Sequence, residues 1–587
     1  FTSGDRIATG TALSGGYTAP GKGNDPIRTP EALPTGRNFY ALDGSLLPTR
    51  LGFELGAELA DKARLETPQP EGKEAVILWA SDAVRDEGSM IAFGLDLLGV
   101  TPVWNSRGIV NGLELLPLDA HRLQRRDVVF TTSGLFRDLY ASQLELLDQA
   151  GLMALAASRE VIARDYPALQ PALDRALATL EYRVAKGDEP LSANTVAANW
   201  VNETRHLLQA HPNAADTGQL GREASLRIFG TAPGSYGAGI NRLAERSGSW
   251  QDRAQLGQVY ISRMGHAYGS GVHGQSAHET FNRQLGQIRH TYLGRASHLY
   301  GLIDNNDAFD YLGGLNLAVE TLTGQPPESF VIDHSRRERA TLEPLAQALG
   351  QELRSRYLNP QWLKPLMAEG YAGARTMGSE FMEYLWGWQV TSPQMIKSWM
   401  WDEVKAVYLD DRLALGLDSF LQQGHNQQVR SNMMAILLVA AQKDFWDADD
   451  ATLQQLSRDF ADNIIRFGLP GSGHTHPSHP VYTFVTARVD AEQAAALQQV
   501  LDAARQPSPQ PAAPAVASIQ EITPAQADSQ EGDASSQAQE SGTSDSDSTE
   551  PASDKIQPVS DPILFAAALL LLLLAGGALR GRFGGKR

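Results

Sequence analysis

The densest group of metal-binding side chains in this sequence is a histidine motif near residue 475. The stretch "GLPGSGHTHPSHP" contains His474, His476 and His479. The spacing H-x-H-x-x-H, with Gly and Pro between the rings, is typical of metal binding by imidazole, and loops of this kind also form plain turns. Because the sequence has no Cys, metal chemistry here has to use His, Asp, Glu or a ligand brought by the substrate.

Carboxylates gather in a second stretch, "LIDNNDAFDYLGG", which contains Asp304, Asp307 and Asp310. This stretch does not fit an EF-hand calcium loop, because the Gly at the sixth position and the closing Glu are missing. It remains a concentrated source of oxygen ligands and proton acceptors.

Two further charged loops follow apolar segments that predict buried strands. "EAVILWAS" is followed by "SDAVRDEG", and "RRDVVFTTSG" is followed by "LFRD". Ligands of a parallel sheet bind beyond the carboxyl ends of its strands. These loops therefore either surround a cofactor-sized ligand with acids, bases and cations, or only cap the helices that follow them.

The stretch "GGYTAPGKG" nearly matches a phosphate-binding loop. Gly16, Gly21 and Lys22 have the spacing G-x-x-x-x-G-K, but Gly23 stands where the motif needs Ser or Thr to hold Mg²⁺. The preceding residues are a poor strand, and prolines follow where the phosphate-binding helix has to begin. The first 40 residues predict a loop or meander without nucleotide binding.

Strands that alternate with helices predict a parallel sheet covered on both faces. The expected fold is mixed α/β with parallel-sheet subdomains, a mainly helical C-terminal region and one C-terminal transmembrane helix. The predicted segments are an α/β subdomain at 1–150, a helical segment at 151–220, a second α/β subdomain at 221–358, a helical region at 359–505, a disordered acidic linker at 506–561, a transmembrane helix at 562–579 and a basic tail at 580–587.

The composition excludes one broad class of function. The formal net charge of −18 argues against binding to nucleic acid through a basic surface. Part of the acidic excess lies in 506–561, which is rich in Ser, Gln, Ala and Pro and has too little apolar surface to fold. The chain begins with Phe1, so we expect it to be processed or to be the later part of a longer protein.

The C-terminal stretch "DPILFAAALLLLLLAGGALRGRFGGKR" predicts a membrane anchor. Its uncharged segment is at the short end of the length that crosses a bilayer as a helix. Basic residues follow it, and the other flank is acidic, so the positive-inside rule places the C-terminus in the cytoplasm. We expect the folded body to be extracytoplasmic, in the periplasm, which requires an export signal.

Seven stretches together resemble the large subunit of cobaltochelatase, which is related to the porphyrin-binding large subunit of magnesium chelatase. They run in order from about residue 15 to 450 and match the later part of a longer subunit. The stretches are "GGYTAPGKGNDPIRTPEALPTGRNFYALD", "LLGVTPVWNSRGIVNGLELLPLD", "DVVFTTSGLFRDLY", "GTAPGSYGAGI", "IDNNDAFDYLGGL", "LNPQWLKPLMAEGYAGA" and "MWDEVKAVYLDD".

The resemblance implies a protein that binds a tetrapyrrole and inserts a divalent metal, with Co²⁺ first and Mg²⁺ or Fe as alternatives. ATP would be hydrolysed by separate AAA+ subunits. Insertion removes two pyrrole N–H protons and strips water from the ion, steps that carboxylates and imidazoles in a dry cleft can perform. The implied residues are Arg37, Asn38, Arg137, Asp138, Ser235 and Tyr236 for tetrapyrrole binding, and Glu87, Asp304 and Asp307 for proton transfer or metal delivery.

Two positions depart from the family pattern. Ser89 follows Gly88 where the family has an acid, and Asn306 stands where we expect Asp. Some membrane-associated relatives look like haem-demetallating proteins that work without ATP. The sequence therefore leaves two alternatives to insertion: an anchored, ATP-independent dechelatase for haem or a related metallotetrapyrrole, and a binding protein without chemistry.

Overall fold

The protein is described by a computed structural model. The chain divides into two compact units, Phe1–Ser508 and Pro509–Arg587, and every described residue belongs to the first. The structure describes residues 3–19, 21–22, 33, 36, 38–40, 44–68, 72–119, 124–213 and 216–505. The predicted linker, transmembrane helix and basic tail lie outside these residues. Among the described helices, none has the length and apolar character needed to cross a bilayer.

The centre of the described unit is an eight-stranded sheet with the order β12-β11-β10-β3-β6-β7-β8-β9. The five strands from β11 to β7 are parallel, while β12, β8 and β9 at the two edges pair antiparallel. The strands are β3 (Lys73–Leu78), β6 (Val128–Thr132), β7 (Ile228–Gly230), β8 (His266–Gly269), β9 (Val272–Ser276), β10 (Ile288–Arg295), β11 (Glu328–Asp333) and β12 (Thr341–Pro344).

The sheet separates two hydrophobic cores, because successive side chains of a strand point to opposite faces. Along β3, Val76 and Leu78 belong to one core, and Ala75 and Ile77 belong to the other. All six residues of β3 are buried, as expected for a central parallel strand covered on both faces. This explains why the apolar run "EAVIL" predicted a strand.

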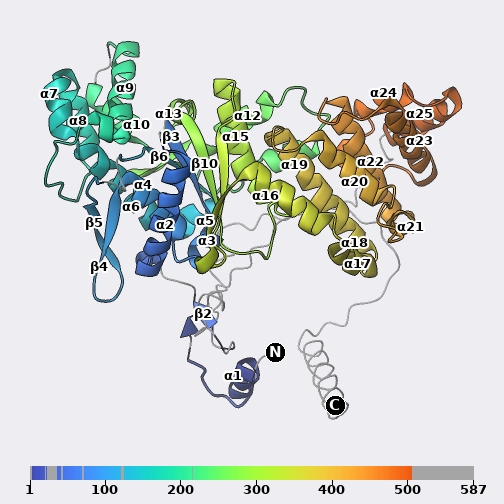
Figure 1. Ribbon diagram of the computed structural model, residues 1–587, viewed down its shortest axis with the longest axis horizontal. Coiled ribbons are helices and arrows are strands. Elements are labelled where there is room, and N and C mark those ends of the chain that lie inside the picture. The colour runs from blue at the N-terminus through green and yellow to red at the C-terminus, as the bar shows by residue number, and fades with distance from the viewer. Residues whose placement is uncertain are drawn as a thin grey trace, which may run out of the picture. The chain divides into compact units, whose positions relative to one another are not determined.

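Three helices from the N-terminal half pack against strands of the sheet: α2 (Arg50–Glu66), α4 (Ser89–Leu98) and α6 (Ala141–Ala156), with α2 also packed against α4 (Figure 1). The other helices of this half are α3 (Ala80–Arg85), α5 (Gly134–Leu139), α7 (Arg159–Asp165), α8 (Gln170–Leu177), α9 (Thr195–Ala210) and α10 (Thr217–Ser225).

Helices from the middle of the chain contribute to the core of the second face, where α12 packs against α15. They are α11 (Ile240–Glu245), α12 (Ala254–Met264), α13 (His278–Leu285), α14 (Asn306–Ala308), α15 (Gly314–Thr323) and α16 (Leu345–Glu352). Three π-helical segments interrupt the helices that follow β10: η5 (Phe309–Gly313), η7 (Leu353–Tyr357) and η8 (Thr376–Met382).

The region after residue 359 is helical, as predicted. Figure 1 shows its last helices gathered away from α7–α10. The helices are α17 (Pro360–Ala368), α18 (Tyr371–Arg375), α19 (Glu383–Thr391), α20 (Ser398–Tyr408), α21 (Leu417–Leu421), α22 (Asn426–Gln442), α23 (Asp450–Phe467), α24 (Val481–Thr486) and α25 (Ala491–Arg505).

The structure differs from the sequence prediction in three places. The two α/β segments predicted at 1–150 and 221–358 share one sheet, because β10 pairs with both β3 and β11. The stretch "TPVW" lies outside the central sheet, in a separate antiparallel hairpin of β4 (Val100–Trp104) and β5 (Val110–Leu115). The N-terminal stretch contains a helix, α1 (Ser3–Leu13), where we expected a loop.

The near-phosphate-loop is not organised as one in the described residues. Gly21 and Lys22 form a two-residue strand, β1 (Gly21–Lys22), which pairs in parallel with β2 (Asn38–Tyr40). A phosphate-binding loop joins a buried strand to a helix N-terminus, whereas residues 16–19 have no regular structure.

Candidate functional site

The main candidate site is a pocket of about 720 Å³ at the carboxyl ends of β3, β6 and β10. This is the sheet edge at which the sequence predicted a ligand. Its lining includes Trp79, Ser81, Asp82, Arg85, Ser133, Leu135, Tyr236, Arg295, Tyr300, Asp304, Asn305, Asn306, Asp307, Tyr311, Glu380 and Tyr384. The volume lies within the range of sites for cofactor-sized molecules.

Local structure explains how these side chains reach the pocket. Trp79 precedes α3 directly, and Ser133 caps α5 by accepting a hydrogen bond from the backbone N–H of Phe136 at 3.1 Å. Gly134 lets the Tyr236 ring approach, because a Cβ atom at Gly134 would lie 2.7 Å from that ring. Short strand-to-helix connections therefore carry the pocket residues.

Asp82 is the most perturbed carboxylate of the pocket. The residue is only 9% exposed. Burial and the negative charge of Asp86 raise its pKa to about 6, while the charges of His334 and Arg85 act in the opposite direction. A carboxylate with this pKa exists in both protonation states near neutral pH, as a proton acceptor or donor requires.

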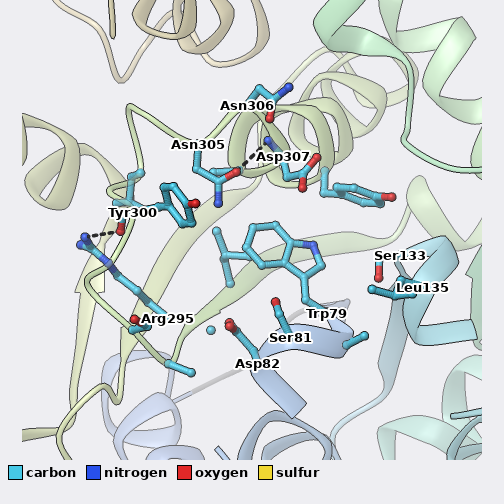
Figure 2. A pocket seen from close by; sticks show the side chains of 18 of the residues that line it. Trp79, Ser81, Asp82, Ser133, Leu135, Arg295, Tyr300, Asn305, Asn306 and Asp307 are labelled. Carbon is cyan, nitrogen blue, oxygen red and sulfur yellow. Dashed lines mark hydrogen bonds between the residues drawn. The ribbon is translucent and has the colours of Figure 1, made fainter. Parts of the chain in front are cut away.

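Asp307 and Asp304 line the same pocket, where the sequence predicted them to act. Figure 2 shows Asp82 and Asp307 on opposite sides of the Trp79 indole ring. Asp307 is exposed to the pocket, and the surrounding protein and Asp310 raise its pKa. Asp304 pairs with Arg356 at 2.5 Å; burial raises its pKa against the effect of that cation.

Asp310, which the sequence did not single out for catalysis, has a structural role. Its buried carboxylate accepts hydrogen bonds from four consecutive backbone N–H groups at the start of α11, at 2.6 to 3.3 Å. A carboxylate at a helix N-terminus compensates the helix dipole. Burial outweighs these bonds and raises the pKa of Asp310.

π-Helical segments supply several groups to this pocket. η5 contains Tyr311, η8 contains Glu380, and η7 contains Arg356, which pairs with Asp304. Such segments are rare and occur frequently at functional sites. Three of them around one pocket are an independent indication that this end of the sheet is the functional end.

Glu87 does not line the pocket, although the sequence predicted a catalytic role for it. Its backbone has a positive φ of 58°, and the Thr49 hydroxyl donates a hydrogen bond to its carboxylate at 2.7 Å. The N–H of Thr49 also donates to the Glu87 carbonyl oxygen at 3.0 Å. Glu87 therefore fixes the start of α2, and Asp82 of the same loop is the acid that lines the pocket.

Arg137 also has a different role from the one predicted. Its guanidinium is buried and donates hydrogen bonds to the carbonyl oxygens of Thr231, Ala232 and Ser235 at 2.8 to 3.2 Å. These contacts all use Nη1, Nε donates to Asp138 at 2.7 Å, and Arg137 is not among the residues that line the pocket. It stabilises the loop that carries Tyr236.

Asp138 and Tyr236 belong to the same arrangement. The Tyr236 hydroxyl donates to the Asp138 carboxylate at 2.5 Å, and the hydrogen bond from Arg137 lowers the pKa of Asp138. Tyr236 is 59% exposed and lines the pocket, whereas Asp138 and Ser235 do not. Of these predicted residues, only Tyr236 can contact a ligand there.

Two predicted tetrapyrrole-binding residues cannot be placed. Arg37 lies outside the described residues, and for Asn38 only the backbone, in β2, is described. Their roles stay predictions.

The histidine motif near residue 475 does not form a metal centre. His474 and His479 are buried and both contact the Ser247 hydroxyl, at 2.6 and 2.9 Å, and His474 also contacts Glu383 at 2.8 Å. His476 is exposed. Among the described residues, no group of three or more His, Asp or Glu side chains could hold a metal ion. Instead of a metal site, the motif forms hydrogen bonds that connect its loop to α19.

The protonation state of His479 agrees with a structural role for this motif. Burial and the positive charges around it lower the pKa of His479 to about 3. Its Nδ1 atom accepts the backbone N–H of Val481 at 2.9 Å. A neutral ring with both nitrogens in protein hydrogen bonds has no lone pair left for a metal.

The sequence pointed to the loop that contains Asp82 and Arg85 without assigning either a specific role, and it missed Trp79. The available signal was their position directly after a buried apolar strand. Sequence spacing gave no way to decide which acid of "SDAVRDEG" points into a pocket.

The fold and the pocket define a class of protein. A parallel sheet with aromatic rings and titratable carboxylates around a pocket at its carboxyl edge is typical of proteins that bind a flat, cofactor-sized molecule. Comparison with known proteins makes this specific. Residues 7–453 match the CobN/Magnesium Chelatase family, and the chain belongs to this family.

Individual relatives agree with this assignment. The chain is 29% identical over 443 residues to the aerobic cobaltochelatase subunit CobN of a Sinorhizobium species. It is 28% identical over 453 residues to the chloroplastic magnesium-chelatase subunit ChlH of Oryza sativa subsp. japonica. The structure is similar to the catalytic subunit of cobaltochelatase from Mycobacterium tuberculosis, with a TM-score of 0.65 and 29% identity.

These matches cover most of the chain but a minor part of each relative. They include 74% and 76% of this chain but only 32% and 29% of the two curated relatives. For the solved structure the shares are 78% of this chain and 36% of the other. The chain therefore spans about a third of the length of the relatives that it matches.

Proposed function

We propose that this chain is the tetrapyrrole-binding part of a metal chelatase of the cobaltochelatase type, which inserts Co²⁺ into a corrin- or porphyrin-type macrocycle. The observation that carries the proposal is the pocket at the carboxyl edge of the sheet, where Asp82 and Asp307 lie on opposite sides of Trp79 (Figure 2). Membership of the family supports the reaction class.

The shape and the walls of the pocket suit a flat macrocycle. Trp79, Leu135, Tyr236 and Tyr300 line it, and the last three are at least half exposed. Exposed aromatic and apolar side chains at a pocket gain from burial under a ligand ring, and aromatic rings add stacking contacts. This arrangement favours an extended π-system as the ligand.

Asp82 and Asp307 have different roles in the proposed insertion reaction. When a divalent ion enters a metal-free macrocycle, two pyrrole N–H bonds break, and each nitrogen keeps the electron pair that binds the metal. In this proposal, the Asp82 carboxylate, with its pKa near 6, accepts the two protons one after the other and passes each to solvent through the open pocket. Asp307 offers oxygen ligands to the incoming ion, replacing some of its water.

Arg85 is the cation that we assign to the ligand's acidic or amide side groups, in place of Arg137. It lines the pocket and, among the described residues, has no ion-pair partner. An arginine can bind a carboxylate through two parallel hydrogen bonds. The second pocket arginine, Arg295, is already paired with Glu352 at 3.2 Å.

ATP, partner subunits and the membrane remain part of the proposal. The chain has no complete phosphate-binding loop, so ATP would act through separate AAA+ subunits. The membrane anchor and the periplasmic position proposed for the body rest on the sequence of 562–579 alone.

Removal of a metal is a second candidate function, and the raised pKa values of the pocket carboxylates favour it. Burial raises the pKa values of Asp82 and Asp304, and burial and Asp310 raise that of Asp307. Asp82, whose pKa is about 6, is partly protonated near neutral pH and can deliver a proton to a macrocycle nitrogen as the metal leaves. The same pocket would then demetallate haem or a related metallotetrapyrrole without ATP.

One set of incubations separates these functions. The purified full chain is mixed with a metal-free corrinoid or porphyrin plus Co²⁺ or Mg²⁺, and separately with haem, each without ATP and with ATP plus cobaltochelatase AAA+ subunits. Absorption spectra report metal insertion or loss. ATP-dependent insertion supports the first function, and iron loss without ATP supports the second. Binding without any metal exchange would reject both and leave a carrier.

A further inference from the structure

A buried ion pair lies directly behind Asp82 and takes no part in the mechanism described above. Asp86 is 2% exposed and His334 is fully buried. The Asp86 Oδ2 atom lies 2.8 Å from His334 Nε2. The two residues come from the end of α3 and from the segment after β11, and are 248 positions apart in sequence.

The hydrogen bonds of His334 determine where its protons are. Nδ1 lies 2.9 Å from the carbonyl oxygen of Ile332, which can only accept, so Nδ1 carries a proton. Nε2 faces a carboxylate, so a second proton lies between Nε2 and Asp86. Burial lowers the pKa of His334, but the hydrogen bond and charge of Asp86 and the charge of Asp82 outweigh it and raise the pKa.

Asp86 is held firmly in position for this contact. Its second oxygen, Oδ1, accepts the backbone N–H groups of Gly88 at 2.8 Å and Ser89 at 3.1 Å. These N–H groups belong to the start of α4, whose dipole stabilises a negative charge there. The His334 ring packs over Gly294, where a Cβ atom would lie 3.0 Å from His334 Cε1.

The space between Asp82 and Asp86 is nearly dry. Both line a cavity of about 10 Å³, whose other walls are mainly apolar and include Ile77, Met90 and Phe136. That volume is about the space of a single water molecule. Charges in such surroundings interact strongly because little solvent screens them.

The charged groups that face Asp82 are few. α3 contributes Asp86 and Arg85, and the segment after β11 contributes His334; β10 adds only the backbone N–H of Ala296. The other charged groups of the pocket wall near β10 are already paired: Arg295 with Glu352 and Asp304 with Arg356.

We propose that Asp86 and His334 form a positioning pair that sets the proton affinity of Asp82, and so the pH at which Asp82 accepts a pyrrole proton. This inference rests on the proposed function. The Asp86 carboxylate makes the neighbouring Asp82 hold a proton more tightly, and the His334 cation makes it hold the proton less tightly. During insertion the pyrrole proton passes to Asp82 and leaves through the open pocket to solvent.

Two substitutions test the proposal, because they remove charges of opposite sign. Asp86→Asn removes the neighbouring anion and should move the acidic limb of the insertion rate profile to lower pH, by about one unit. His334→Gln removes the cation and should move the same limb to higher pH by a similar amount. Initial rates of Co²⁺ insertion into a metal-free porphyrin, measured across pH with the full chain, ATP and cobaltochelatase AAA+ subunits, give both midpoints.

The controls separate charge from structure. Arg412→Ala, which alters a surface pair with Glu403, should leave the midpoint unchanged. A lower rate with an unmoved midpoint in both variants, or shifts in the same direction, would overturn the proposal. An inactive wild-type chain that still binds porphyrin would instead reject the proposed function, on which the proposal depends.

A measurement on the unsubstituted chain covers the case in which a variant does not fold. With ¹⁵N-labelled histidine, one imidazole should keep protons on both nitrogens at about pH 8, where ordinary histidines are neutral. The absence of any such ring at that pH would overturn the shared-proton pair and with it the proposal.

Discussion

Asp127 and Asp82, two buried acids at opposite ends of the central sheet, are held in different ways. At the amino end, buried Lys73 lies 3.5 Å from Asp127 and 3.6 Å from Glu203, and Arg227 contacts Asp127 at 2.7 Å. At the carboxyl end, Asp82 has no described cation within ion-pair distance.

The pKa values follow this difference. At the amino end, the charges of Arg227 and Lys73 outweigh burial and lower the pKa of Asp127. At the carboxyl end, burial and a neighbouring anion raise that of Asp82. Asp127, paired with cations, stabilises the fold, whereas Asp82, which has no such pair, is available to a ligand.

The largest expected effect belongs to the amino end. Asp127→Asn leaves Arg227 and Lys73 without their shared anion, which should lower the free energy of unfolding by about 3–5 kcal/mol. Denaturant unfolding measures this change. Asp165→Asn, which alters an exposed pair with Arg164, is the matched control and should change stability by less than about 0.5 kcal/mol. Equal effects of both would contradict the contrast between buried and exposed pairs.

The next effect belongs to the carboxyl end. Asp82→Asn removes the proposed proton acceptor and should lower the rate of metal insertion about a hundredfold, while tetrapyrrole binding persists. Initial rates and a binding titration by absorption measure the two separately. A variant that retains the full rate would show that another group accepts the proton.

The same substitution should act on stability with the opposite sign to Asp127→Asn. The folded-state pKa of Asp82, about 6, is above its ordinary value of 3.8, so its ionised form opposes folding at neutral pH. Asp82→Asn should therefore stabilise the chain at pH 7 by about 3 kcal/mol. The gain should disappear as the pH falls through 6 towards 4, and unfolding curves at both pH values test this sign.

The smallest of these effects concerns ligand affinity. Arg85→Ala should weaken binding of a tetrapyrrole with carboxylate side groups about tenfold, because one charge-assisted pair is lost. A macrocycle without carboxylates should bind both proteins equally. An equal loss of affinity for the two ligands would indicate that Arg85 maintains the structure of the pocket and does not bind the carboxylate side groups.

The sequence predicted the strands whose burial is encoded by their own residues. β3 and β6 are short apolar runs, and each was predicted in place. β10, at the centre of the sheet, was missed because its sequence "IRHTYLGR" includes charged and polar residues. Its stability comes from pairing with β3 and β11 on both sides, which no local pattern reveals.

The candidate site was predicted as loops more successfully than as residues. The acidic stretch supplied Asp304 and Asp307, and the Gly-rich turn supplied Tyr236. Glu87 was preferred to Asp82 because spacing does not encode the positive φ that turns Glu87 towards α2. The histidines were misassigned because their partners, Ser247 and Glu383, are 227 and 91 positions away in sequence.

The π-helical segments make the shape of the pocket wall depend on the number of residues in a turn as well as on residue type. A π turn holds one more residue than the α turn that it replaces. Deleting a single residue from η5 would therefore restore α geometry there and remove the widened turn, while the turns on either side keep their helical phase. The wall that carries Asp307 and Tyr311 is thus defined partly by the number of residues in a turn, a property that a substitution leaves intact and a one-residue deletion removes.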